Sequence, residues 1–272
     1  MKYFTQPPIG TPLNLAHPLN QGLVGYWPMV EGAGINANDS SGKGNHGILT
    51  NMVQGTTNGW SGGNFGRAIM CDGINDYVDL GAMRVVNGLS RLSIFAWIKI
   101  TTQDGRVSSI VHRGIDSPTP FRFSLSPSQT GIGGDNDILV LMSQGVNTYG
   151  YTTSDVLKLN QWAFVGFVFD GSKSGNSNRL QIYANGISIP VTFVGTIPST
   201  VPADTGNLFL GHYTNFGFFP GFIQEVRIYS RNISSQEIQQ LYTDPFCMYE
   251  QKNNFRWFST FDRKGSFFFS RL

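Results

Sequence analysis

Apolar positions along the chain follow the period of β-strands almost throughout. Residues 92–100 (LSIFAWIKI) and 161–169 (QWAFVGFVF) are apolar on both faces, which is typical of strands buried in the middle of a sandwich. Asn185-Gly186 stands between two extended runs and predicts a hairpin, because both residue types tolerate positive φ. Further strands are predicted at 23–27, 77–80, 109–112, 121–125, 138–142, 208–211 and 222–229.

Residues 221–245 join the last of these strands to a helix. Ser234 to Glu237 spells S-x-x-E, a capping box in which the two side chains satisfy backbone N–H groups at a helix start. Asp244-Pro245 ends this helix, because proline disfavours helical geometry at the residue before it. No helix is predicted before Ser234, so the chain is expected to be all-β with one short C-terminal helix.

The composition predicts one large domain with extensions at both ends. The 272 residues include 33 glycines and only 13% charged side chains, which fits a globular protein with many tight turns. We expect an extended N-terminal arm at 1–20, a sandwich at 21–245 and an aromatic, basic C-terminal arm at 246–272. Cys71 and Cys247 are expected to be ordinary thiols, although their spacing leaves one long-range bridge open.

The charge and hydropathy of the chain bear on its partners and location. A net charge of +2 gives no reason to expect nucleic-acid binding. The start of the chain, MKYFTQPPIGTPLN, lacks the apolar run of a signal peptide, and no stretch approaches the length of a membrane span, so we expect no membrane partner.

Eight segments follow one another in a characteristic order. They are GLVGYWPMVEGAG, DSSGKGNHG, FGRAIMCDGINDYVDLG, LSIFAWIK, WAFVGFVFDG, LQIYANG, LFLGHY and GFIQEVRIYSRNISSQEIQQLY. This order resembles the laminin-G-like branch of the concanavalin A-like jelly rolls. The resemblance implies an all-β, two-sheet antiparallel jelly-roll sandwich, here with one short C-terminal helix and extended terminal arms.

Two flanking segments extend the resemblance. The opening HPLNQGLVGYW and the ending LYTDPFCMY are similar to proteins of tailed phages and environmental viruses. This similarity implies a structural protein on the virion surface, such as a capsid decoration, a head fibre or a tail component. Its expected partners are other virion proteins and further copies of the same chain.

Catalysis has little support in the residues. Glycosidases of this fold need two closely placed carboxylates, and the E-x-D-x-x-E strand motif of the laminarinase-like enzymes is absent. The aspartate pairs 72/76 and 135/137 lie in Gly/Asn-rich turns, where turn structure is the simpler interpretation. The four histidines, at 17, 46, 112 and 212, are isolated in the sequence and form no zinc motif. We therefore expect no enzyme, with glycoside hydrolysis as the weakest alternative.

Calcium is the metal that the sequence favours, because Ca²⁺ takes six to eight oxygen ligands and the loops are rich in Asp and Asn. The resemblance implies a structural calcium held by Glu31, Asp39 and Glu225. Asp72, Asn75 and Asp76 form a second candidate site. The alternative is that these side chains only bond the backbone of their turns.

Two interaction surfaces remain as functional candidates. A lectin-like surface would stack aromatic rings on sugars, with core packing as the alternative use of the same rings. Its candidate residues are Tyr149, Tyr151, Tyr213, Phe216 and Phe218.

The other surface is the C-terminal arm, whose nine aromatic residues must pack on something. Its candidate assembly residues are Phe255, Arg256, Trp257, Phe258, Phe261, Arg263, Phe267, Phe268 and Phe269. The preferred function is a non-catalytic interaction module docked into a virion by its terminal arms. The alternative is a glycan-binding adhesin, and nucleic-acid binding by the arm is a weaker interpretation.

Overall fold

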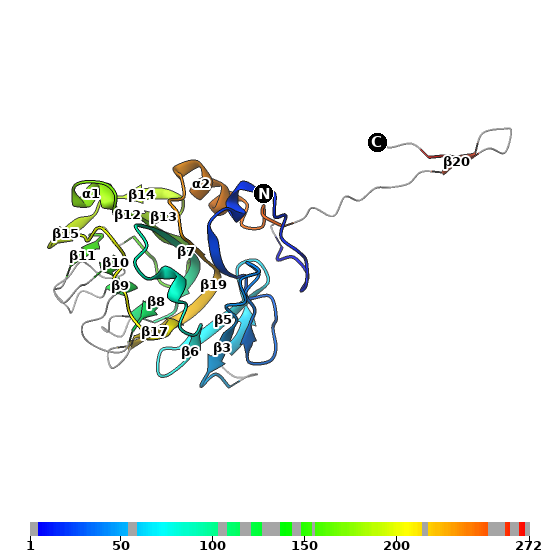
Figure 1. Ribbon diagram of the computed structural model, residues 1–272. Helices are drawn as coiled ribbons and strands as arrows, with labels where there is room; N and C mark the ends of the chain where they lie inside the picture. Colours follow the sequence, from blue (N-terminus) through cyan, green and yellow to red (C-terminus); the bar gives the residue numbers. More distant parts are fainter. Residues whose placement is uncertain are drawn as a thin grey trace.

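Two antiparallel sheets lie face to face in the computed structural model (Figure 1), which confirms the predicted two-sheet sandwich. The structure describes residues 5–53, 59–102, 108–114, 121–126, 137–142, 148–153, 156–213, 217–249, 259–261 and 267–269. Among these residues, no helix is both long enough and apolar enough to cross a membrane.

The first sheet has eight strands in the order β14-β13-β12-β7-β19-β5-β4, with β1 paired to β19. They are β1 (Leu23–Trp27), β4 (Gly59–Gly62), β5 (Arg67–Asp72), β7 (Arg91–Ile100), β12 (Trp162–Asp170), β13 (Leu180–Ala184), β14 (Ile187–Ile189) and β19 (Pro220–Tyr229). The central strands β7 and β12 are the two runs that are apolar on both faces. The β13–β14 hairpin turns at Asn185 and Gly186, whose φ angles are 49° and 80°, as the Asn-Gly pair predicts.

The second sheet has nine strands in the order β15-β11-β10-β9-β8-β16-β6-β3-β2. They are β2 (Asn36–Ala37), β3 (Gly47–Thr50), β6 (Tyr77–Asp79), β8 (Ser108–Arg113), β9 (Phe121–Ser126), β10 (Asp137–Met142), β11 (Tyr149–Tyr151), β15 (Thr192–Val194) and β16 (Leu208–Leu210). A two-stranded hairpin of β17 (His212–Tyr213) and β18 (Gly217–Phe218) follows β16.

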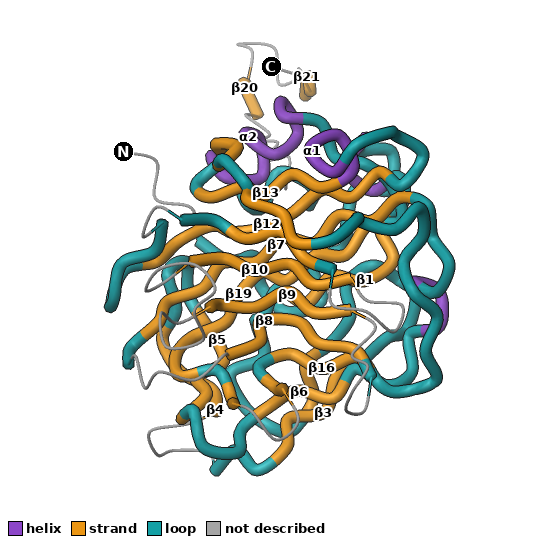
Figure 2. The backbone as a smooth tube through the Cα atoms, turned by 90° about the vertical axis from the view of Figure 1, so that its left-hand side faces the viewer, coloured by secondary structure: helices purple, strands orange, loops and turns teal. Residues whose placement is uncertain are grey.

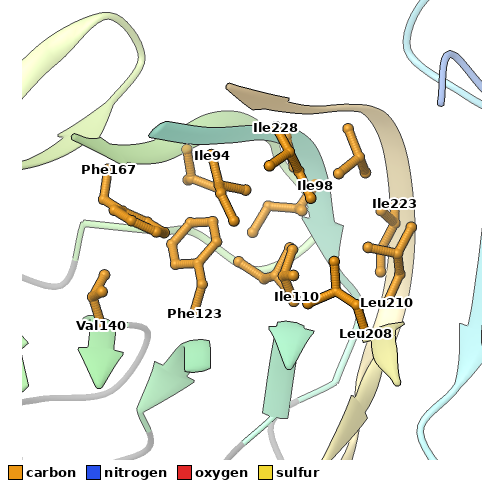
Figure 3. Close-up of a cluster of buried hydrophobic side chains, with 14 of the residues drawn as sticks. Ile94, Ile98, Ile110, Phe123, Val140, Phe167, Leu208, Leu210, Ile223 and Ile228 are labelled. Atoms are coloured by element: carbon orange, nitrogen blue, oxygen red, sulfur yellow. The ribbon is translucent and has the colours of Figure 1, made fainter. Parts of the chain in front are cut away.

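Buried aliphatic and aromatic side chains fill the space between the sheets. Figure 3 shows Phe123 of β9 and Phe167 of β12 pointing toward each other from opposite sheets, and their ring centroids are 5.4 Å apart. Because side chains alternate along a strand, every second residue of each sheet enters this core. Ile94 and Ile98 of β7 do so from one side and Ile110 of β8 from the other.

A second apolar cluster covers part of the outer face of the eight-stranded sheet. Figure 2 shows helix α2 (Ser235–Thr243) beside β13 and β12. Its Ile238 and Leu241 pack over outward side chains that include Phe95, Trp97 and Phe164. The remaining buried members are Leu13, Leu19, Leu23, Tyr26, Val168, Tyr183, Tyr229, Ile233, Phe246, Met248 and Tyr249.

Both terminal segments belong to this outer cluster. Leu13 pairs with Tyr249 in an antiparallel bridge, and the 3₁₀ helix η1 (Pro18–Asn20) places Leu19 in the same cluster. The expected boundary at Pro245 therefore falls inside a packed region, since Phe246, Met248 and Tyr249 are buried. The folded unit includes residues 5–20 and continues to Tyr249.

Helix α2 begins with the predicted capping box. Ser234 Oγ accepts a bond from Glu237 N at 3.3 Å, and Ser234 N donates to Glu237 Oε2 at 2.9 Å. Glu237 is also paired with Arg231 at 2.6 Å. Before it, the prediction of no earlier helix is wrong for one turn, α1 (Asn176–Arg179), which has no apolar stripe. A second 3₁₀ turn, η2 (Arg84–Val86), precedes β7.

Cys71 and Cys247 are free thiols, so the long-range bridge left open by their spacing is not formed. Cys71 lies in the core between the sheets, and burial raises the pKa of its thiol well above the ordinary range. Burial likewise raises the pKa of Cys247, to about 11. Both groups are therefore weak nucleophiles at neutral pH.

Candidate functional site

Aromatic and histidine side chains gather on the outer face of the nine-stranded sheet, where β6, β16 and the β17–β18 hairpin meet. Val78, Leu208 and Leu210 face the core, so the alternation of strands turns Tyr77 and Phe209 outward. Gly211, with φ +78°, lets the chain turn after β16 and brings His212 to the same face. We call Tyr77, Phe209, His212, Phe218 and His112 the ring cluster.

The rings of this cluster contact one another closely. His212 lies 4.8 Å from Tyr77, 4.8 Å from Phe209 and 5.2 Å from Phe218, measured between ring centroids. Tyr77 and Phe209 meet edge to face at 5.6 Å. These four side chains are partly exposed, so they form a platform that a flat apolar surface of a ligand can contact.

Polar groups border the platform at Asp79, two residues from Tyr77 on the same strand face. Its carboxylate accepts bonds from Gly81 N at 2.8 Å and from Asn207 Nδ2 at 3.0 Å. These two bonds hold the carboxylate and the amide at the edge of the rings. Carboxylate and amide groups in a fixed position are suited to bonding hydroxyl groups.

His112 is the buried member of the cluster and lies opposite Phe209 on the neighbouring strand β8. Its ring lies 6.1 Å from that of His212 and 6.4 Å from that of Phe209. Burial, together with the neighbouring His212 and Arg122, lowers the pKa of His112 to about 3. His112 is therefore neutral at physiological pH.

The predicted lectin-like residues separate into two places on this face. Phe218 belongs to the ring cluster, while Tyr149 and Tyr151 lie on β11 with ring centroids 6.0 Å apart. Strand β11 is four strands from β16 in the sheet order, or about 19 Å at the usual strand spacing. Tyr213 lies on β17, but its side chain and all of Phe216 fall outside the described residues.

Sequence reasoning missed Tyr77, Phe209, His112 and His212 as parts of one site. The two histidines are 100 positions apart and looked isolated, yet β8 pairs with β16 and places His112 opposite Phe209. The alternation in Leu208-Phe209-Leu210 indicates that Phe209 faces away from the two leucines. The strand order, which determines the residues beside Phe209, cannot be derived from the sequence.

Asp39, a predicted calcium ligand, accepts hydrogen bonds from the backbone around it. Its Oδ1 accepts bonds from Tyr26 N at 3.0 Å and Ser41 N at 2.8 Å, and its Oδ2 accepts from Asn45 N at 2.9 Å. Glu31 Oε1 accepts a bond from Asn38 N at 2.9 Å. These contacts match the alternative in which the carboxylates organise the turn.

Glu225, the third predicted ligand, is fully buried at a bulge in β19 where its φ is +57°. Its Oε2 accepts bonds from Tyr26 Oη at 2.6 Å and from Arg227 Nη2 at 2.7 Å. Arg227 Nη2 also donates to the carbonyl of Pro245. This buried pair joins β1, β19 and the C-terminal segment.

The second calcium candidate is also a bonded turn. Asp72 Oδ1 accepts bonds from Ile74 N at 2.7 Å and Asn75 N at 3.3 Å, and Asp76 Oδ2 accepts from Asp72 N at 3.0 Å. In the described part of the chain, no three His, Cys, Asp or Glu side chains gather as a metal site. Calcium, which takes six to eight oxygen ligands, stays a prediction at both places.

The assembly residues of the C-terminal arm have no described side chains. Two strands are described there, β20 (Ser259–Phe261) and β21 (Phe267–Phe269), which pair with each other and place Phe261 opposite Phe267. Figure 1 shows β20 apart from the two sheets. The remaining candidates in the arm, from Phe255 to Phe258 and Arg263, lie outside the described residues.

A family model described as concanavalin A-like lectin/glucanases superfamily matches residues 72–239, which is more than half of the chain. The chain belongs to this superfamily. A search of curated proteins finds no match. The predicted concanavalin A-like resemblance is thereby confirmed, whereas its viral branch stays a prediction.

Solved structures resemble the sandwich over most of its length. Domain 4 of AbnA, a GH43 extracellular arabinanase from Geobacillus stearothermophilus, in complex with arabinotriose, is 21% identical with a TM-score of 0.57, covering 81% of this chain and 98% of that domain. Trypanosoma rangeli sialidase in complex with sialic acid is 12% identical with a TM-score of 0.57, over 85% of this chain but only 34% of the sialidase. At these identities the likeness establishes the fold alone.

A further structure of this fold comes from a toxin. The binding domain of Botulinum neurotoxin DC in complex with rat synaptotagmin II is 13% identical with a TM-score of 0.56, covering 88% of this chain and 54% of that one. The superfamily fold thus occurs in proteins with different ligands, and the ligand of this chain must be argued from its own residues.

Proposed function

We propose that this chain is a non-catalytic carbohydrate-binding module and that its ring cluster holds a neutral oligosaccharide. The observation that carries the proposal is the set of four partly exposed rings beside Asp79 and Asn207. Rings of this kind pack on the apolar faces of sugars, and the carboxylate and amide bond the hydroxyl groups around those faces.

The described glutamates support a binding role over hydrolysis. Glu225 is paired with Arg227, Glu237 is held by the helix cap and Arg231, and Glu31 bonds the loop backbone. A glycosidase needs two carboxylates placed on either side of a sugar. Domain 4 of AbnA, which is similar to this chain over nearly its whole length, was solved with arabinotriose, and this supports the choice of ligand class.

Calorimetric titration with arabinotriose, followed by a glycan array, tests the proposal. Tyr77→Ala and Phe218→Ala are each expected to weaken binding at least about tenfold, as truncating an aromatic anchor commonly does. Tyr149→Ala removes a ring from the same face outside the cluster and is the matched control. A blank array, or a loss confined to Tyr149→Ala, would contradict the proposed site.

A second role, as a surface part of a virion, is favoured by the C-terminal hairpin. Strands β20 and β21 form a two-stranded sheet of their own. An isolated hairpin is marginally stable in water and gains stability by packing on another surface. We propose that residues 250–272 attach the module to a larger assembly.

Deleting residues 250–272 separates the two roles. The shortened chain should bind glycans as the full chain does, but it should no longer be incorporated into particles that contain the full chain. Normal incorporation of the shortened chain would remove the assembly role of the arm and leave the binding role untouched.

A further inference from the structure

Three side chains form a stripe on the outer face of the eight-stranded sheet, opposite the ring cluster. The strand register places Lys99 of β7 between Trp162 of β12 and Phe222 of β19. The ammonium of Lys99 lies 4.1 Å from the centroid of Phe222 and 5.6 Å from that of Trp162. We call Trp162, Lys99 and Phe222 the Lys99 stripe.

The Lys99 stripe begins where the cover of this sheet ends. The next outward pair along the same two strands is Trp97 of β7 and Phe164 of β12. These two side chains are buried beneath α2 and the C-terminal segment. Trp162, Lys99 and Phe222 are instead partly exposed. The stripe is thus an aromatic surface left open beside a covered one.

Lys99 is a cation that lacks an anionic partner within the described chain. The described ion pairs join Arg91 to Asp170, Arg227 to Glu225 and Arg231 to Glu237. The nearest outward polar side chain on β19, Gln224, is already used, since its Nε2 donates to Arg67 O at 2.6 Å and its Oε1 accepts from Asn64 N at 3.1 Å. The stripe therefore offers a positive charge between two rings.

We propose that the Lys99 stripe is a second binding surface and that its ligand is a carboxylated polysaccharide. The sugar rings would pack on Trp162 and Phe222, and a carboxylate would accept a charge-assisted bond from Lys99. Charge complementarity selects this ligand over a neutral one, because a neutral chain leaves the ammonium without a negative partner. With the ring cluster on the opposite face, one molecule would bridge two polysaccharide chains.

Affinity electrophoresis of the full chain in gels containing polygalacturonate tests this inference. Lys99→Gln is expected to weaken retention at least tenfold and Trp162→Ala to do the same, whereas Lys173→Gln, which removes an exposed lysine elsewhere, should leave retention unchanged. Retention of the unaltered chain should fall as salt rises, because salt screens an exposed charge pair. Melting curves of each variant show whether its fold is intact. If Trp162→Ala does not fold, the retention of Lys99→Gln decides the test.

Loss of binding at the Lys99 stripe can be distinguished from loss of binding at the ring cluster. Arabinotriose binding should survive Lys99→Gln, and polygalacturonate binding should survive Tyr77→Ala. Three results would overturn the inference. The unaltered chain is not retained, Lys99→Gln is retained as strongly as the unaltered chain, or light scattering shows that the unaltered chain self-associates and that Lys99→Gln is monomeric. The last result would make the stripe an interface between copies of this chain.

Discussion

The buried Glu225–Arg227 pair makes the stability of the protein depend on pH. Burial raises the pKa of Glu225 to about 7, although Arg227 and Tyr26 partly offset it. Burial lowers the pKa of Arg227, but its neighbours, chiefly Tyr26 and Glu225, together raise it beyond the ordinary range, so the arginine stays charged. Of the two partners, only Glu225 titrates near neutral pH, because its desolvation outweighs the attraction of the pair.

Glu225→Gln is therefore expected to change the pH dependence of stability. A carboxyl whose folded pKa is raised stabilises the protein fully below its unfolded pKa of about 4.5. That contribution is lost as pH rises through about 7. The stability difference between the unaltered protein and the variant should fall by about 3 kcal/mol between pH 4.5 and pH 8. Urea unfolding across this range measures it, and parallel profiles would contradict the assigned shift.

His112 should act in the opposite direction. Its pKa is lowered to about 3 in the folded protein, so below about pH 6.5 the unfolded chain binds a proton that the folded one refuses. The unaltered protein should lose stability relative to His112→Gln as pH falls from 6.5 toward 3. Chemical unfolding at pH 7 and pH 4.5 checks the sign, which a constant difference would disprove.

Local residue patterns were readable in the sequence, while contacts between distant residues were not. The Ser234–Glu237 capping box and the Asn185-Gly186 turn depend on neighbours a few positions away, and both were predicted. The contacts of His112 with His212 and of Glu225 with Tyr26 depend on strand order and on a bulge. Neither can be derived from the spacing of residues.

Among the elements, α2 has the most local origin. Ser234→Ala removes the side chain that accepts a bond from Glu237 N and should cost about 1 kcal/mol of stability. Ser235→Ala, inside the first turn, is the control and should be nearly neutral. Thermal and urea unfolding of both variants provide the test, and equal losses would show that the cap contributes nothing of its own.

Elements that tertiary pairing creates were missed. Strands β4 and β15 have four and three residues, and α1 is a single turn. Segments this short have too few positions for a hydrophobic period to appear. They exist because β5, β11 and β13 offer them an edge or a surface, whereas the long strands β7, β12 and β19 were visible from their own composition.

At the scale of the whole molecule, the structure moves the end of the folded unit. Ending the chain at Tyr249 should leave stability unchanged, because the two sandwich sheets and the outer apolar cluster lie before that point. Ending it at Pro245 removes the buried Phe246, Met248 and Tyr249 and should cost at least about 3 kcal/mol. Unfolding of the two shortened chains measures the difference, and equal stability would restore the boundary expected from the sequence.

The two open surfaces also emerge only at this scale. Each sheet turns one face to the core and one outward, so a two-sheet sandwich always has two outer faces. Here α2 and the terminal segments cover part of one face, leaving the Lys99 stripe beside them, and the ring cluster lies on the other. A single sequence shows which residues are aromatic but not which of them the neighbouring elements leave open.

Hydroxyl-radical footprinting with and without saturating arabinotriose tests whether the ring cluster binds the sugar, because it reports which rings a bound sugar covers. If the sugar binds the ring cluster, Tyr77, Phe209 and Phe218 become protected while Trp162 and Phe222 keep their reactivity. Protection centred on Tyr149 and Tyr151, or no protection at the ring cluster under saturating ligand, would contradict it.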